Sequence, residues 1–115
     1  MDLYVNGVDD GGSYSGTGGS LSYSTGSSFI GGRGGSTMLF DGAIDDVRVY
    51  NRALSGEEIQ GLMHTWPDTS DPTLLGYWDF DEGEGQQAAD LSLYGNHGQL
   101  GSTLGVDSSD PDWGG

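Results

Sequence analysis

Residues 40–63, FDGAIDDVRVYNRALSGEEIQGLM, contain the clearest succession of strand, turn and helix signals in the chain. From residue 43 to residue 50 the sequence alternates with a period of two, which is typical of a β-strand. Asp45, Val47 and Val49 fall on one face of this strand. Because two of the three are apolar, we expect that face to point inward and to carry Asp45 with it.

A short helix is predicted directly after the strand, over residues 55–63. Ser55 has the position of an N-cap, and Glu58, three residues later, completes a capping box. Ile59, Leu62 and Met63 follow at the spacing of one helix face. The stretch therefore predicts a strand that ends in a short capped helix.

The same stretch resembles the C-terminal signature of the laminin-G-like, concanavalin A-like jelly-roll domains. LYVNGV (residues 3–8) and FIGGRGG (residues 29–35) lie where that family has its preceding strands. The resemblance covers about the first sixty residues. It implies an all-β, antiparallel jelly-roll sandwich, partial or permuted, with one short helix.

A second piece of the chain resembles the N-terminal start of the same family, through YWDFDEG (residues 77–83) and the turn DLSLYGNHG (residues 90–98). We therefore predict the C-terminal portion of one jelly roll over residues 1–63, a linker over 64–74 and the N-terminal portion of another over 75–115. Two arrangements produce that order. The chain spans two tandem domains, or its second piece folds back to pair with residues 44–50. We expect tandem domains as the genetic origin and the fold-back as the structure of this chain.

The length of the chain allows at most one small domain, and its composition is very acidic. The 115 residues include 18 acidic side chains, three Arg and no Lys, for a net charge of −15. Such a chain repels nucleic acids and anionic membranes. The acidity indicates either a solvated surface suited to high salt or oxygen ligands for hard cations. There is no Cys and no apolar stretch long enough to span a membrane. We expect the sequence to be an excerpt of a longer multidomain protein.

Asp45 leads to a hypothesis about a metal ion. A carboxylate on an apolar strand face needs backbone donors or a cation to offset its desolvation. The family resemblance implies that Asp45, Asp90 and Asn96 are the candidate ligands of a structural Ca²⁺ ion. The alternative, which stays open here, is that Asp45 accepts hydrogen bonds from loop N–H groups.

Paired carboxylates at Asp79, Asp81 and Glu82 raise the question of glycosidase chemistry. The family's glycosidases place both catalytic carboxylates on one central strand in an aromatic cleft, and this chain lacks that portion. Solvated carboxylates are the prediction here, and His64 and His97 are predicted to be surface residues. We therefore expect no enzymatic activity.

The resemblance implies an extracellular binding or adhesion module, secreted or at the cell surface, which recognises glycan or protein ligands. Tyr77, Trp78 and Trp113 are candidates for stacking on sugar rings, although Trp78 is also a candidate for the core. Two alternatives stay open. The chain is an accessory carbohydrate-binding module of a secreted glycoside hydrolase or protease, or a structural repeat of a surface stalk. No nucleic acid and no membrane insertion is expected.

Overall fold

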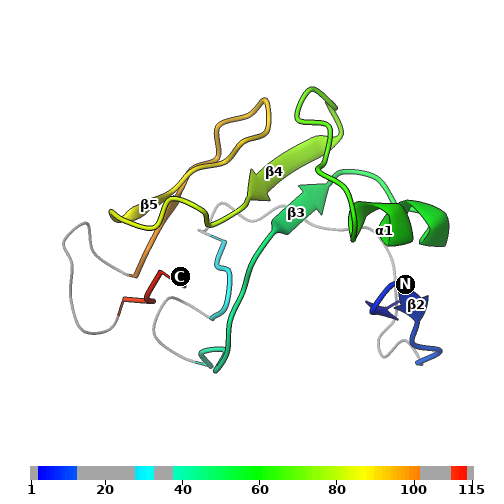
Figure 1. Ribbon diagram of the computed structural model, residues 1–115, viewed down its shortest axis with the longest axis horizontal. Coiled ribbons are helices and arrows are strands. Elements are labelled where there is room, and N and C mark those ends of the chain that lie inside the picture. The colour runs from blue at the N-terminus through cyan, green and yellow to red at the C-terminus, as the bar shows by residue number, and fades with distance from the viewer. Residues whose placement is uncertain (1–2, 13–27, 33–37, 102–109, 114–115) are drawn as a thin grey trace. The chain divides into compact units, whose positions relative to one another are not determined.

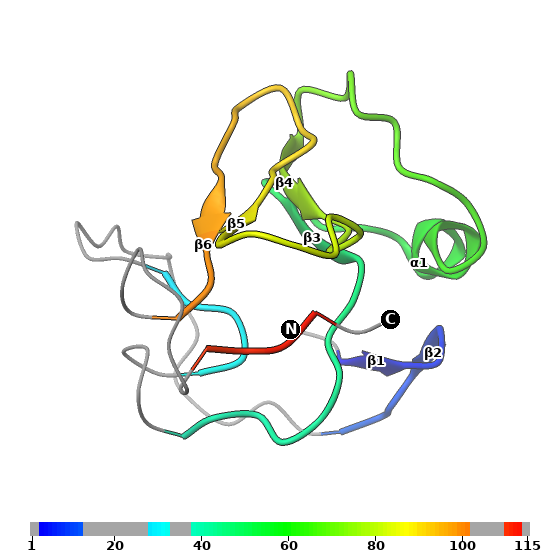
Figure 2. The same cartoon turned by 60° about the vertical axis from the view of Figure 1, so that its left-hand side comes forward.

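A computed structural model describes residues 3–12, 28–32, 38–101 and 110–113. Figures 1 and 2 draw the chain, which divides into two compact units. Unit 1 comprises Met1–Thr25 with Arg52–Asp68, and unit 2 comprises Gly26–Asn51 with Thr69–Gly115. Within the part of the chain that the structure describes, no helix has the length and apolar character needed to cross a lipid bilayer.

Unit 1 begins with a tight hairpin of β1 (Tyr4–Val5) and β2 (Val8–Asp9). Asn6 and Gly7 form its two-residue turn, with φ of 51° and 77°. Two consecutive positive φ angles are typical of a type I′ turn, for which Asn-Gly is the preferred sequence. The dipeptide thus forms the hairpin turn that its residue types predict. The strand expected to end at Val8 is correspondingly divided in two.

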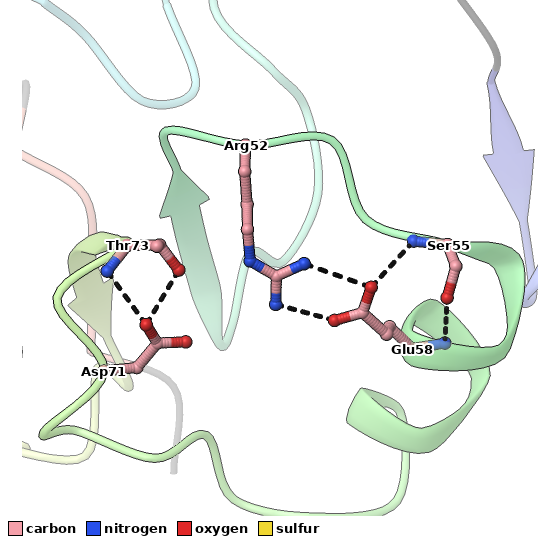
Figure 3. A network of polar contacts seen from close by, with 5 residues as sticks. All are labelled: Arg52, Ser55, Glu58, Asp71 and Thr73. Atoms are coloured by element: carbon pink, nitrogen blue, oxygen red, sulfur yellow. Dashed lines mark hydrogen bonds and ion pairs between the residues drawn. The ribbon is translucent and has the colours of Figure 1, made fainter.

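Helix α1 (Gly56–Leu62) follows in the same unit and has the capping box that the sequence predicts. The Glu58 N–H donates to Ser55 Oγ at 3.2 Å, and the Ser55 N–H donates to Glu58 Oε1 at 3.0 Å (Figure 3). Arg52 donates to the two carboxylate oxygens of Glu58 at 3.1 and 2.6 Å. These hydrogen bonds, that of Arg52 first, lower the pKa of Glu58 to about 2. The helix contacts the hairpin, because Gln60 Nε2 donates to the carbonyl of Gly7 at 3.0 Å.

Unit 2 contains an antiparallel pair of strands, β3 (Val47–Tyr50) and β4 (Leu74–Trp78), which lie side by side in Figure 1. Their register places Val47 opposite Trp78 and Arg48 opposite Tyr77, with an irregularity between Val49 and Tyr50. A strand from the second half of the sequence thus pairs with the strand before the helix. This is the pairing that the fold-back arrangement predicts; the tandem origin stays a prediction.

Short turns and a second ribbon complete unit 2. Before β4, Asp71 Oδ1 accepts hydrogen bonds from the N–H and the hydroxyl of Thr73, each at 2.8 Å (Figure 3). After β4, β5 (Gln87–Ala88) pairs with β6 (Gly98–Gln99), as Figure 2 shows. The described strands therefore form three two-stranded sheets. This arrangement agrees with an all-β class with one short helix, and the jelly-roll sandwich stays a prediction.

The apolar core of the described residues is small and lies in unit 2. It consists of four side chains that are at most 7 % exposed: Leu74, Tyr77, Ala88 and Leu100. Gly76 belongs to it as well, because the ring of Trp78 occupies the space that a side chain at this position would need. Three of these five residues come from β4, so β4 is the central element of the unit.

The strand predicted over residues 43–50 is shorter than expected, because β3 begins at Val47. Asp46 has a φ of 48°, which takes the backbone out of the extended conformation immediately before β3. The alternation of faces therefore does not extend back to Asp45, which is exposed. Val49 is 45 % exposed, whereas Arg48 is half-buried. The expectation that Asp45 and Val49 lie on a buried face is wrong.

Candidate functional site

The turn between β5 and β6 is built around the carboxylate of Asp90, which is 4 % exposed. Its Oδ1 accepts hydrogen bonds from the N–H groups of Tyr77 and Ser92 at 2.8 and 2.9 Å. Its Oδ2 accepts from the N–H of Asn96 and the hydroxyl of Ser92, at 2.8 and 2.9 Å. Each oxygen thus has two donors, which is full use of a carboxylate's acceptor capacity.

These contacts place the turn along the edge of β4 that β3 leaves open. Tyr77 O accepts from the Leu91 N–H at 2.8 Å, and Leu75 O accepts from Asn96 Nδ2 at 2.9 Å. The indole N–H of Trp78 donates to the carbonyl of Asn96 at 3.1 Å. The turn therefore satisfies backbone groups that an additional strand would otherwise bind.

The environment of Asp90 determines its charge. Burial by itself would raise the pKa of Asp90, but the hydrogen bonds from Tyr77, Ser92 and Asn96 outweigh burial and hold the pKa below its ordinary value of 3.8. The backbone N–H of Asp90 donates to Nδ1 of His97 at 3.0 Å. Asp90 is thus an ionised, buried acceptor, and His97, which is exposed as predicted, also contributes to the turn.

The predicted calcium ligands are only partly brought together. Asp90 and Asn96 are joined by a hydrogen bond, whereas Asp45 is exposed and its Oδ1 accepts from the adjacent Asp46 N–H at 3.0 Å. The residues that the structure describes contain no group of three or more His, Cys, Asp or Glu side chains suited to a metal ion. A cation at Asp90 would have to displace existing donors, so this carboxylate does not fit the ion as it stands. Calcium binding stays a prediction for experiment.

A second polar group lies on the β3–β4 pair. The hydroxyl of Tyr77 donates to Asp46 Oδ1 at 3.1 Å, and the guanidinium carbon of Arg48 lies 5.4 Å from the centre of the Tyr77 ring. Burial, followed by the hydrogen bond and negative charge of Asp46, raises the pKa of Tyr77 to about 12. Tyr77 therefore has a structural role.

Carboxylates considered for catalysis are hydrogen-bonded within a chain turn. Asp79 Oδ1 accepts from the Asp81 N–H at 3.2 Å, and Glu82 Oε1 accepts from the Ala89 N–H at 2.6 Å. Burial, then the negative charges of Asp79, Asp45 and other nearby carboxylates, raise the pKa of Asp81. Asp81 is nevertheless exposed, whereas Asp79 and Glu82 are half-buried rather than fully solvated. Their contacts describe a turn with concentrated negative charge.

The aromatic residues predicted to stack on sugars are not free platforms. Tyr77 is 2 % exposed, and Trp78 and Trp113 are half-buried. The indole N–H of Trp113 donates to the carbonyl of Gly85 at 3.0 Å, as that of Trp78 does to Asn96. Trp66 in unit 1, which no sequence pattern singles out, is 75 % exposed.

A shallow pocket of about 400 Å³ lies in unit 2 beside Asp45, the residue predicted to be a calcium ligand. Its lining consists of Gly31, Phe40, Ala43, Ile44 and Asp45. The Phe40 N–H donates to the carbonyl of Gly31 at 2.8 Å, which connects two chain segments at the pocket. Gly31 has a φ of 77°, and a side chain there would come within 2.9 Å of Ile44 Cδ1. The pocket thus has an apolar lining with one carboxylate, a feature that no sequence motif indicated.

Comparison with known proteins identifies a family for the first half of the chain. The sequence model described as the concanavalin A-like lectin/glucanases superfamily, of the laminin G type, matches residues 1–60, which is just over half of the 115 residues. None of the curated proteins and none of the solved structures matches the chain. The matched residues include β1, β2, β3 and most of α1.

Proposed function

Since the chain belongs to the concanavalin A-like lectin/glucanases superfamily, we propose that it is a non-catalytic binding module of an extracellular protein. The family match is the observation that carries this proposal, because laminin-G-like domains generally bind carbohydrate or protein ligands and are typically extracellular. The carboxylates of Asp79 and Glu82 support a non-catalytic role, since each already accepts a backbone hydrogen bond. Ligand binding, and not bond cleavage, is the proposed activity.

The net negative charge of the chain disfavours some classes of ligand. At a net charge of −15, anionic glycans and anionic proteins are repelled at moderate ionic strength. Neutral glycans and basic proteins are therefore the ligand classes that we propose. Exposed apolar side chains, such as Phe40 at 60 % and Trp66 at 75 %, are available for contact with either class.

Binding to immobilised neutral glycans, anionic glycans and basic extracellular proteins tests the proposal. We expect saturable binding to a neutral glycan or a basic protein, no binding to the anionic glycans, and no release of reducing sugar from any glycan. A heat-denatured sample is the control for non-specific adsorption. Sugar release, or the absence of saturable binding to every ligand, would contradict a non-catalytic binding role.

A further inference from the structure

Five exposed apolar side chains gather on two short segments of unit 2, residues 28–32 and 38–45. Their exposed fractions run from 47 to 77 %, and the residues are Phe29, Ile30, Met38, Leu39 and Phe40. The hydrogen bond from the Phe40 N–H to the carbonyl of Gly31 holds the two segments together. We call these five residues the Phe40 patch. Exposed apolar side chains on two hydrogen-bonded segments are a candidate site of interaction.

The shallow pocket beside the patch is a candidate site for one apolar side chain of a partner. Phe40 belongs to both the patch and the pocket, and the half-buried Ile44 supplies further apolar lining. The ring of Phe40 lies against Gly42, where an added Cβ would be 2.8 Å from Cε1. Asp45 adds a carboxylate to the lining. An apolar side chain next to a positive charge would match both parts of this lining.

The charges of the chain determine the sign of the partner. Of the three Arg residues, Arg48 lies over the Tyr77 ring and Arg52 is paired with Glu58; Arg33 lies outside the described residues. Near the patch, Asp41 and Asp45 are both exposed. A second copy of this chain would bring another charge of −15 to the interface. Like charges oppose that association, whereas a basic partner is attracted.

The composition of the patch distinguishes protein from sugar. Sugar rings stack on flat aromatic faces, which Phe29 and Phe40 offer, but the other three members of the patch, Ile30, Met38 and Leu39, are not aromatic. Exposed aliphatic and thioether side chains instead match the apolar centre of protein interfaces, in which Met is enriched. We infer that the Phe40 patch docks a basic polypeptide segment, with an apolar side chain of that segment seated in the pocket beside Asp45. This inference rests on the proposed binding function and specifies its ligand.

Three synthetic peptides test the inference by fluorescence anisotropy: alternating Leu and Lys, alternating Leu and Glu, and alternating Ser and Lys. We expect the Leu–Lys peptide to bind at least about tenfold more tightly than either of the others, because the interface needs apolar contact and positive charge together. Phe40→Ala should weaken this binding about tenfold, the size expected for an aromatic anchor. Asp45→Asn should weaken it about threefold, and this difference should shrink at high salt.

Matched variants are available in the same unit. Leu93→Ala removes an apolar side chain that is 61 % exposed, close to the 60 % of Phe40, and Asp112→Asn removes an exposed carboxylate. Both should bind the Leu–Lys peptide like the parent chain. Circular dichroism of each variant checks that the fold is retained.

Several results would overturn the inference. Equal affinity for the Leu–Lys and Ser–Lys peptides, or no effect of Phe40→Ala, would mean that charge alone drives binding. A neutral oligosaccharide that binds the parent and not Phe40→Ala would assign the patch to a glycan, which leaves the binding function intact. A concentration-dependent dimer that Phe40→Ala removes in sedimentation would assign it to a second copy. Failure of every peptide, glycan and protein probe would overturn the inference and the proposed function together.

Discussion

Substitution of Asp90 by Asn leaves the side-chain volume nearly unchanged and alters four hydrogen bonds in unit 2. The carboxylate accepts four hydrogen bonds, two at each oxygen. The amide oxygen of Asn can accept two of these hydrogen bonds. The amide NH₂ group is itself a donor, so it cannot accept from the other two N–H or O–H groups. At about 1.5–3 kcal/mol for each hydrogen bond to a charged group, losing two costs about 3–6 kcal/mol.

We expect the cost of Asp90→Asn to lie at the lower end of that range. Asp90 is almost fully buried, and replacing its charge by a neutral amide removes part of the desolvation cost of the folded state. We therefore expect Asp90→Asn to lower the free energy of unfolding by about 3 kcal/mol. For a domain of this size, that corresponds to a fall in melting temperature of more than about 10 °C.

Urea unfolding followed by tryptophan fluorescence measures the effect. Trp78 is half-buried and hydrogen-bonded to Asn96, so its emission reports on the turn, whereas Trp66 is exposed in unit 1. Asp112→Asn is the matched control, because it removes one exposed carboxylate from the same unit and relieves the same amount of net charge. A change in Asp90→Asn no larger than that in Asp112→Asn would refute the role assigned to the Asp90 hydrogen bonds.

The pH dependence provides a second readout for the same substitution. The pKa of Asp90 is lowered in the folded chain, so its ionised form stabilises the fold above pH 3.8, and this contribution is lost as the pH falls through the lower folded pKa. The parent chain should therefore lose stability below pH 3.8 through this group. The Asp90→Asn variant should lack that component, and an unchanged acid profile would contradict the shift.

Three further substitutions test separate parts of the structure. Ser55→Ala should weaken the chain by about 1 kcal/mol through loss of the N-cap; an unchanged thermal unfolding curve would contradict the capping box. Tyr77→Phe should cost about 1 kcal/mol at neutral pH by removing the hydrogen bond to Asp46. Because the pKa of Tyr77 is raised to about 12, the parent should also lose stability as the pH rises from 10 to 12, and the Phe variant should lack this loss. If Ca²⁺ binds as the sequence predicts, it should raise the melting temperature more than Mg²⁺ at equal ionic strength, and Asp45→Ala should remove the difference; equal shifts would indicate charge screening.

The helix and the β1–β2 hairpin were accessible from the sequence because their signals are local. Ser55 and Glu58 stand three residues apart, and Asn6-Gly7 is a two-residue turn. The fold-back of β4 onto β3 followed from the family's order of strands. In each case a short segment, or a known neighbour relation, contains enough information to fix the backbone.

The exposure of Asp45 was not predictable from alternation alone. A period of two assigns faces only while the backbone remains extended, and Asp46 leaves that conformation at a φ of 48°. The Tyr77 hydroxyl that binds Asp46 comes from a strand 31 residues later. The residues around position 45 contain no information on a contact so distant in sequence. The start of β3 could therefore not be predicted.

Only some of the hydrogen bonds of Asp90 were predictable from the sequence. The Asp-x-Ser spacing of Asp90 and Ser92 is the local signature of a side chain that binds the backbone two residues later, as Asp71 also does with Thr73. The donor from Tyr77 lies 13 residues earlier and needs the folded unit. Asp90 became a candidate ligand because the resemblance implies a calcium site, whereas each of its carboxylate oxygens already accepts two hydrogen bonds.

The saturation of Asp90 has a consequence for how unit 2 is able to grow. A two-stranded ribbon presents two open edges, and each is a template for another strand. On β4, the turn held by Asp90 already binds the carbonyls of Leu75 and Tyr77, so an added strand would first have to unfold that turn. Among the described strands, β3 pairs with β4 alone, and this leaves its other edge without a described strand. Any strand that extends this ribbon toward a larger sandwich would therefore add beside β3, and the stability of the Asp90 turn sets that direction.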